Sequence, residues 1–367
     1  MLAAAKIIDR QTREFLNLEP KESAQIAGLR YVRADTLQIK RKKVGRGFSY
    51  LDANGDRITD KAALTRIKAL AIPPALTEVK ICHLANGHLQ ATGRDGKRRK
   101  QYFYHPQWRK IRSQHKFNRM LLFGAYLPQI RQTAARHLRK HGLPKEKVLA
   151  TVVRLLETTL IRVGNDHYAR KNDSFGLTTL RDRHVDINGS KVRFEFRGKS
   201  GVDHEIELSD RRLATIIKRC QEIPGYEIFK YYDCSGDRHF INSEDVNQYL
   251  QDITKQEFTA KDFRTWAGTL LAATELQKLG DFDSEQQAQS NIATAVKKAA
   301  KRLGNRPATC RKYYIHPVII EAYQNGLLLN LFSQKTKIPL HNEQLNPEEA
   351  IILQVIKKDL ALLNQND

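Results

Sequence analysis

LRYVRADTLQIKRKKVGRGFSYLD, residues 29–52, alternates bulky and polar side chains and leads into a turn-forming run at residues 52–56. This period of two predicts antiparallel strands. Asn86-Gly87, between two short strands expected within residues 78–95, is the strongest local signal for a further hairpin. Helices are expected over residues 3–27 and 60–70. The beginning of the chain therefore predicts a small β-rich domain that ends near residues 104–106.

The pattern becomes helical after Pro106, where apolar residues recur three and four positions apart. We expect this helical pattern to continue through residues 146–169, to be replaced by strands over residues 185–208, and to resume from Ser209 to the end. The predicted fold class is α+β: a small basic β-rich N-terminal domain, residues 1–105, followed by a larger, mainly helical domain, residues 106–367, with a short β-hairpin or sheet. The length of 367 residues agrees with two or three domains of roughly 100 to 200 residues each.

Positive charge is concentrated in the first 150 residues. The chain has 63 Lys and Arg against 40 Asp and Glu, a formal net charge of +23. Residues 1–105 hold 21 basic and 10 acidic residues and residues 106–150 hold 11 and 1, so this part alone carries +21. Such a field attracts a polyanion and releases counterions when one binds. Nucleic acid is the expected partner, with a solubility role, ribosome association or an anionic membrane surface as alternatives.

Composition also bounds the compartment. No run of 18 apolar residues could span a bilayer, and the first residues carry acids where a secretory signal would be apolar. We therefore expect a cytoplasmic, nucleoid-associated protein that does not enter a membrane. The four cysteines are scattered without a C-x-x-C pair, which predicts reduced thiols and argues against both a disulfide framework and a zinc ribbon; they are Cys82, Cys220, Cys234 and Cys310.

Several chemistries have no motif in this sequence. The phosphate loop G-x-x-x-x-G-K-[ST], the zinc motif H-E-x-x-H, the nucleophile elbow G-x-S-x-G and a compact Asp/Glu cluster for two metals are all absent, and the histidines, such as His83, His88, His105 and His115, have no ligand spacing. We therefore expect no cofactor, no ATP and no metal. Cleavage of a phosphodiester by side chains alone needs a nucleophile, an acid for the leaving oxygen, and fixed cations for the non-bridging oxygens.

Five segments supply such groups in order. They are GRDGKRRKQYFYH (93–105), IRVGNDHYARKNDSFGLTTL (161–180), FRGK (196–199), KDFRTW (261–266) and LGNRPATCRKYY (303–314). Together they resemble the type IB DNA topoisomerases, in particular the compact poxvirus and bacterial branch, over roughly residues 29–328. The resemblance implies relaxation of supercoiled duplex DNA by a monomer that clamps the duplex, through a 3'-phosphotyrosine intermediate.

The resemblance also assigns roles to single residues. The catalytic arginines fall on Arg162 and Arg264, the general-acid lysine on Lys199, a second catalytic lysine on Lys261, and the nucleophile on Tyr314. Asn305 stands where poxvirus members have a histidine, a substitution associated with the bacterial branch. Because Asn can donate a hydrogen bond but carries no charge, phosphate stabilisation at this position survives while proton transfer does not.

Each residue also has a plain structural interpretation. The adjacent Tyr313 could be the nucleophile instead, and the family spacing decides for Tyr314. Arg162 could reach solvent beyond an apolar stretch, Arg264 could form a surface pair with Asp262, and Lys199 could be a solvated turn residue.

DNA contacts are expected on a basic segment that runs into a strand. Cations position a protein on phosphates, while Gln and Tyr can reach base edges. Alternation would turn Phe103 inward. By resemblance and by charge, the expected DNA-binding residues are Lys97, Arg98, Arg99, Lys100, Gln101, Tyr102, Tyr104 and Tyr168.

Two other functions remain open from the sequence. A tyrosine recombinase shares the Arg, Lys, Arg and Tyr chemistry, but typically has H-x-x-R where this chain has Lys261 to Arg264, and its N-terminal domain is helical. A DNA-binding module without catalysis would explain the charge and leave the ordered motifs as coincidence.

Overall fold

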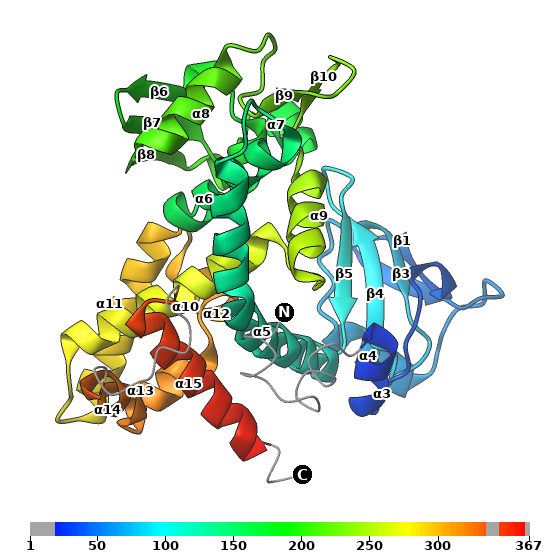
Figure 1. Cartoon of the computed structure of the whole chain (residues 1–367). Helices are drawn as coiled ribbons and strands as arrows, with labels where there is room; N and C mark the ends of the chain where they lie inside the picture. The colour runs from blue at the N-terminus through cyan, green and yellow to red at the C-terminus, as the bar shows by residue number, and fades with distance from the viewer. Residues whose placement is uncertain (1–18, 335–344, 364–367) are drawn as a thin grey trace. The chain divides into compact units, whose positions relative to one another are not determined.

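The computed structural model describes residues 19–334 and 345–363, and the N-terminal part of the helix predicted over residues 3–27 lies outside them. The chain divides between Arg119 and Met120 into two compact units, which we call the N-terminal and the C-terminal unit (Figure 1). The first is rich in strands and the second is mainly helical, so the α+β prediction is confirmed. The division falls inside helix α5 (Pro106–Leu138), and the domain boundary predicted after residue 105 stays a prediction.

The N-terminal unit is built on a five-stranded antiparallel sheet with the order β2-β1-β3-β4-β5. Ile67 of helix α4 packs with Ile39 and Ile81 of the sheet, and the side chain of Asp60 caps that helix by accepting from the N–H of Ala63 at 2.7 Å. The predicted short helix and both predicted strand pairs are therefore confirmed. The elements are α3 (Pro20–Ile26), η1 (Ala34–Thr36), β1 (Ile39–Val44), β2 (Gly47–Leu51), α4 (Lys61–Ala69), β3 (Thr77–Ile81), β4 (Leu89–Arg94) and β5 (Lys100–Tyr104).

The connection around Asn86-Gly87 is longer than a two-residue turn, because β3 ends at Ile81 and β4 begins at Leu89. Gly87 is needed for close packing: a Cβ there would lie 2.7 Å from the Sγ of Cys82. The carbonyl of Asn86 accepts from the N–H of Arg30 at 2.9 Å, so the loop ties down the segment before β1.

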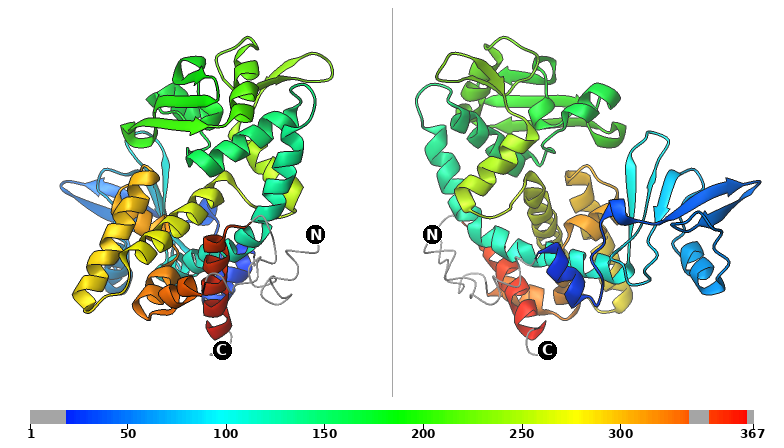
Figure 2. Two further views of the ribbon diagram at one scale, coloured as in Figure 1. Left: turned by 60° about the vertical axis from the view of Figure 1, so that its left-hand side comes forward. Right: turned by 90° about the vertical axis from the view of Figure 1, so that its right-hand side faces the viewer.

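The C-terminal unit packs helices around α10, which lies beside α11 (Figure 2). A three-stranded antiparallel sheet, β6-β7-β8, buries alternate residues of β7 and packs β7 against α8. Its helical elements are α6 (Lys145–Thr159), α7 (Asp166–Asn172), η2 (Leu177–Thr179), η3 (Asp182–His184), η4 (Lys199–Gly201), α8 (Arg211–Gln221), α9 (Ser243–Thr254), α10 (Ala260–Leu279), α11 (Glu285–Arg302), α12 (Pro307–Tyr314), α13 (Pro317–Gln324), α14 (Leu327–Ser333) and α15 (Pro347–Leu363). Its strands are β6 (Val185–Asn188), β7 (Lys191–Arg197), β8 (Asp203–Ser209), β9 (Lys230–Tyr232) and β10 (Arg238–Phe240).

The prediction of continuous helix from Ser209 to the end is wrong at β9 and β10, which pair as an antiparallel hairpin. Asp233 closes their turn, since its Oδ1 accepts from the N–H groups of Ser235 and Asp237 at 2.9 Å each. An Asp that binds the backbone two and four residues later favours a turn over a helix. Among the described residues no helix is long and apolar enough to cross a membrane, and all four cysteines are free.

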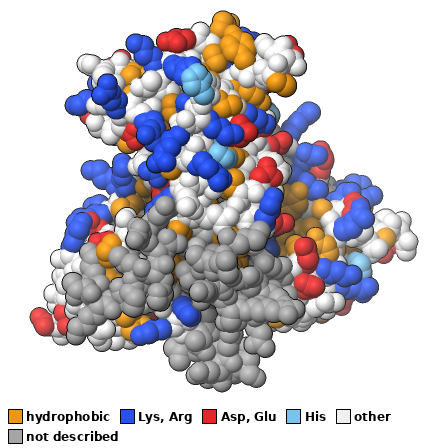
Figure 3. Space-filling view, in the orientation of Figure 1, with side chains coloured by type: hydrophobic (Ala, Val, Ile, Leu, Met, Phe, Trp, Pro, Cys, Tyr) orange, Lys and Arg blue, Asp and Glu red, His pale blue; other side chains and the backbone are white. Residues whose placement is uncertain are grey.

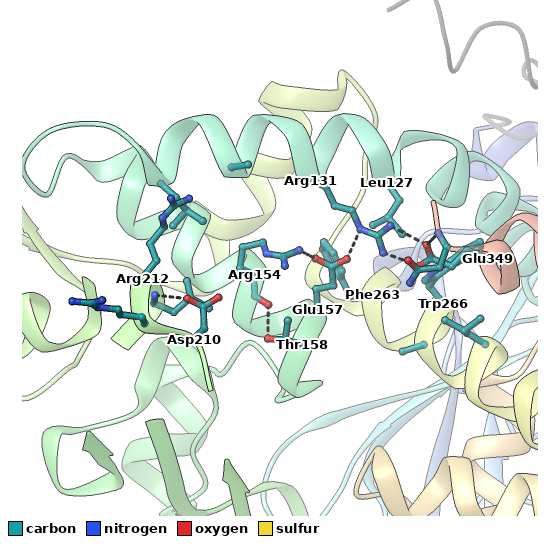
Figure 4. A pocket seen from close by; sticks show the side chains of 17 residues that line it. Leu127, Arg131, Arg154, Glu157, Thr158, Asp210, Arg212, Phe263, Trp266 and Glu349 are labelled. Carbon is teal, nitrogen blue, oxygen red and sulfur yellow. Dashed lines mark hydrogen bonds and ion pairs between the residues drawn. The ribbon is translucent and has the colours of Figure 1, made fainter. Parts of the chain in front are cut away.

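A buried ion-pair network connects α15 to the centre of this unit (Figure 4). Glu349, only 2% exposed, accepts from the guanidinium of Arg131 at 2.7 and 2.9 Å and from the indole of Trp266 at 3.2 Å. Arg131 also pairs with Glu157 at 2.6 Å, and these partners raise its pKa although burial opposes them. The network lines a cleft and holds four helices, α5, α6, α10 and α15, at one point.

We expect Glu349→Ala to lower the free energy of unfolding by about 3 kcal/mol, because it leaves the buried guanidinium and the indole N–H without their acceptor. Urea denaturation measures this loss. The exposed carboxylate of Glu321, on α13, gives the control Glu321→Ala, which should shift the midpoint little. Equal midpoints for both variants would show that the network adds no stability.

Candidate active site

Arg162 lies on an extended segment, so the prediction of helix throughout residues 146–169 is wrong between α6 and α7. Leu160 takes the left-handed conformation (φ 59°) and ends α6. The following backbone pairs with a distant loop: the N–H of Leu177 donates to the carbonyl of Arg162 at 2.9 Å, and that of Thr178 to Val163 at 2.7 Å. Gly176 permits this approach, because a Cβ there would lie 2.5 Å from the oxygen of Arg162.

The guanidinium of Arg162 is half-buried and faces the loop before α12. It donates to the carbonyl of Gly304 at 3.3 Å and to the Oδ1 of Asn305 at 2.5 Å. Burial lowers its pKa, while the neighbouring Tyr314 acts in the opposite direction. Arg162 is therefore a fixed donor and not an arginine that extends into solvent.

Arg264 is the most deeply buried cation of the group, at 4% exposure. It projects from α10 and donates to the carbonyl of Leu160, at the end of α6, and to that of Leu303, at the end of α11. Burial first, and then the charge of Arg162, lower its pKa. Its Nε has no hydrogen-bond partner among the described residues, so one donor remains for a ligand. The alternative of a surface pair with Asp262 is excluded by this burial.

Tyr314, and not Tyr313, lies beside these arginines. The guanidinium carbon of Arg264 is 5.4 Å from the centroid of the Tyr314 ring. Thr269 donates to the backbone carbonyl of Tyr314 at 3.3 Å, and Gly268 lets α10 approach, since a Cβ there would lie 2.5 Å from the same oxygen. Tyr313 is 47% exposed, and the ammonium of Lys312 makes a cation–π contact with its ring.

Lys199 lies in the turn between β7 and β8, as the sequence indicated. The turn is tight, because Ser200 and Gly201 both have positive φ, at 67° and 74°. The ammonium is exposed, yet Lys199 lines the same small pocket as Arg162 and Arg264. The structure thus brings the predicted general-acid residue to the two arginines.

The two remaining predicted catalytic residues differ in placement. The Nδ2 of Asn305 is buried and has no hydrogen-bond partner among the described residues, while its Oδ1 holds Arg162. Lys261 is exposed in the first turn of α10, and its ammonium makes no hydrogen bond or ion pair with any residue that the structure describes. Asn305 therefore belongs to the pocket region, and Lys261 lies outside the contacts that join the others.

His204 is a pocket residue that the sequence analysis did not single out. It is half-buried on β8, stacks on Phe196 with ring centroids 5.1 Å apart, and lines the pocket with Arg162, Lys199 and Arg264. Burial, followed by the charges of both arginines, lowers its pKa. Period-two alternation with Ile206 and Leu208 on β8 would have placed it on the inner face of the sheet, but its neighbours across the pocket are distant in sequence.

The expected DNA-binding residues of the N-terminal unit lie on β5 and the loop before it. Tyr102 is 47% exposed and stacks on Tyr104, with ring centroids 6.1 Å apart, and Phe103 packs on the core as predicted. The loop is organised by Asp95, whose pKa falls to about 2 because it binds Arg99 and nearby N–H groups. Gln101 donates to the same carboxylate at 3.0 Å.

The other predicted contact, Tyr168, belongs to the C-terminal unit. It is 43% exposed on α7, where Asn165 caps the helix by accepting from its N–H. Lys and Arg side chains gather on the face of this unit that carries α6 to α8 and β6 to β8 (Figure 3). Exposed cations are thus not confined to the first 150 residues.

Comparison with known proteins shows which family the chain belongs to. Residues 105–338 match the model of the eukaryotic DNA topoisomerase I catalytic core, and residues 47–95 match that of the bacterial DNA topoisomerase IB N-terminal domain. DNA topoisomerase 1B of Acanthamoeba polyphaga mimivirus is 31% identical over 296 residues, which are 78% of this chain and 88% of the viral protein. DNA topoisomerase 1B of Vaccinia virus (strain Copenhagen) is 25% identical over 291 residues, 76% of this chain and 87% of that protein.

The fold, the cluster of arginines around Tyr314 and these matches define a DNA topoisomerase, an isomerase that acts on DNA. The chain belongs to the type IB family, as the sequence resemblance indicated. The described residues contain no group of three or more His, Cys, Asp and Glu that could hold a metal ion. That neither metal nor ATP is needed stays a prediction.

We expect Gly304→Ala to slow DNA relaxation roughly 10- to 100-fold, the order that follows from misplacing a site by about 1 Å. Gly304 has φ +58°, and an added Cβ would lie 2.6 Å from the Cε1 of His204. Gly326→Ala is the matched control, because φ is +77° there and no atom lies within 4 Å of an added Cβ. Gly326→Ala should cost about 1 kcal/mol in unfolding free energy, and Gly304→Ala more, because its Cβ also meets the ring of His204. Equal relaxation rates in the two variants would contradict a role for this contact.

Proposed function

We propose that the chain relaxes supercoiled duplex DNA by transient cleavage of one strand, in which Tyr314 forms a 3'-phosphotyrosine and frees a 5'-hydroxyl. One observation carries the proposal: Arg264, buried in α10, lies over the ring of Tyr314 and next to Arg162, which comes from a segment about a hundred residues earlier. A buried and a half-buried cation beside one phenol provide a nucleophile together with charge stabilisation for a phosphodiester.

The arginines would act on the non-bridging oxygens of the attacked phosphate. Charge accumulates there in the transition state, and a guanidinium is a fixed, permanently protonated donor with a planar fork. The Nε of Arg264 and the Nδ2 of Asn305 are buried without partners among the described residues, so each offers a hydrogen bond. Asn305 contributes a donor without charge, which agrees with phosphate stabilisation and not with proton transfer.

Lys199 would protonate the departing 5'-oxygen. Its position in an exposed turn at the edge of the pocket lets the ammonium reach a bound strand, and desolvation by that strand would tune it toward an acid. Lys261 is retained as the second catalytic lysine by resemblance, and bound DNA would have to bring it to the phosphate.

Relaxation would follow from rotation of the free end under superhelical torsion. The 5'-hydroxyl then attacks the phosphotyrosine, the same residues act in reverse, and the phosphodiester is restored. Because the phosphotyrosine conserves the energy of the broken bond, neither ATP nor a metal ion is needed in this scheme. The N-terminal domain, residues 1–105, and the catalytic domain, residues 106–367, would clamp the duplex as a monomer, in the cytoplasm and on the nucleoid.

We expect Tyr314→Phe to abolish both plasmid relaxation in EDTA and covalent attachment to DNA, with DNA affinity nearly unchanged, because the variant loses the nucleophile and few contacts. Tyr313→Phe is the control on the same helix and should remain active. Relaxation by Tyr314→Phe together with inactivity of Tyr313→Phe would move the nucleophile by one residue.

We expect the triple variant Lys97→Ala, Arg98→Ala, Lys100→Ala to flatten the salt dependence of DNA binding by roughly one unit per lost phosphate contact. Arg99 is left in place because its ion pair with Asp95, at 2.7 Å, shapes the loop. Binding isotherms between low and moderate salt measure the slope. Lys278→Ala with Lys298→Ala removes two cations that pair with Glu275, and should leave the slope unchanged. A wild-type slope in the triple variant would place the DNA elsewhere.

A further inference from the structure

The ring of His204 fills the space between the turn that carries Lys199 and the loop that carries Asn305. On one side, a Cβ added to Gly198 would lie 2.5 Å from the Cδ2 and 2.6 Å from the Nε2 of His204. On the other side, a Cβ on Gly304 would lie 2.6 Å from its Cε1. The ring is thus in close contact with two glycine backbones, each directly before a residue placed in the proposed catalytic machinery.

Shape, and not hydrogen bonding, holds this ring. Its plane lies 17° from that of Phe196, the residue opposite it in the β7–β8 register. Neither ring nitrogen has a hydrogen-bond partner among the described residues. The neighbouring guanidinium groups donate to other acceptors: Arg162 to Gly304 and Asn305, and Arg264 to Leu160 and Leu303. Burial first, and then the charges of those two guanidinium groups, oppose a positive charge on the ring and lower its pKa, which favours the neutral imidazole.

The turn beyond Gly198 has few other constraints. The N–H of Gly198 donates to the carbonyl of Val202 at 2.7 Å and that of Gly201 to Gly198 at 3.1 Å, so the turn is closed on itself. Lys199 and Ser200 are exposed. On one side the carbonyl of Arg197, just before Gly198, accepts from the N–H of Phe175 at 2.8 Å. On the other side the ring of His204 lies between Gly198 and Gly304, whose carbonyl accepts from Arg162.

We propose that His204 is a positioning residue whose flat, uncharged ring sets the distance between the Lys199 turn and the Gly304–Asn305 loop, so that the ammonium of Lys199 reaches the leaving 5'-oxygen. The inference rests on the proposed function, because it needs Lys199 as the proton donor. In the cleavage step the phenol of Tyr314 loses its proton to solvent as its oxygen bonds to phosphorus, the bond from phosphorus to the 5'-oxygen breaks, and the proton of Lys199 passes to that oxygen. His204 takes no part in bond making or breaking.

The test compares an ordinary oligonucleotide duplex with one that has sulfur in place of the bridging 5'-oxygen, at a site first mapped from the covalent adduct of the wild-type enzyme. A thiolate leaves without a proton, so loss of proton delivery harms only the oxygen substrate. We expect His204→Ala to slow single-turnover cleavage of the oxygen substrate by roughly 10- to 100-fold, within the range of general-acid catalysis, and the sulfur substrate by less than about threefold. Glu205→Ala, the exposed next residue on β8, is the matched control and should resemble wild type on both.

Two further variants separate positioning from other roles. His204→Phe keeps a flat uncharged ring and should restore most of the oxygen rate. Lys199→Ala with His204→Ala should be no slower than Lys199→Ala alone, because the two changes act through one step. Thermal unfolding confirms that each variant is folded at the assay temperature, and His204→Leu replaces His204→Ala where it is not.

The inference is overturned by equal slowing of both substrates, by His204→Phe as impaired as His204→Ala, by additive effects in the double variant, or by a wild-type rate in His204→Ala. Failure of the proposed function looks different: the wild-type enzyme would then form no covalent adduct through Tyr314 on either substrate.

Discussion

Burial of the Arg264 guanidinium is the constraint on which the site depends. Removing a charge from water costs several kcal/mol, and this cost must be offset by hydrogen bonds that satisfy the group. Here the carbonyls of Leu160 and Leu303 supply them, from the ends of two helices far apart in the sequence. Those helix ends are therefore held at fixed positions around α10, and Arg162 and Asn305 follow directly from them along the chain.

The same burial makes the site selective for an anion. Burial first, and then the nearby charge of Arg162, lower the pKa of Arg264, and a bound phosphate would offset both effects. The donors without partners, on Arg264 and Asn305, are arranged before any ligand arrives. A site organised in this way requires little rearrangement when charge develops on the phosphate.

Local signals sufficed for much of the fold and for the candidate residues. Alternation in residues 185–208 predicts β6 to β8, and helical spacing predicts α5, α8 and α10, because both patterns depend only on neighbours along the chain. The prediction failed at Leu160 and at the β9–β10 hairpin. The helix ends at Leu160, and the backbone after it accepts hydrogen bonds at Arg162 and Val163 from Leu177 and Thr178. No residue near Leu160 in the sequence indicates that partner. The hairpin has strands of three residues, too short for alternation to show.

The sequence by itself determined the family, the order of the motifs, and the tyrosine and arginines that are candidates for catalysis. It could do so because family motifs such as K-D-F-R-T-W are short and contiguous, so they are recognised without the fold. Only the tertiary structure decided that Arg264 is buried over Tyr314 while Tyr313 is exposed, that Lys261 lies outside the cluster, and that His204 belongs to it. The physical reason is that burial and pKa depend on groups brought together across about a hundred residues of chain, which no spacing along the sequence records.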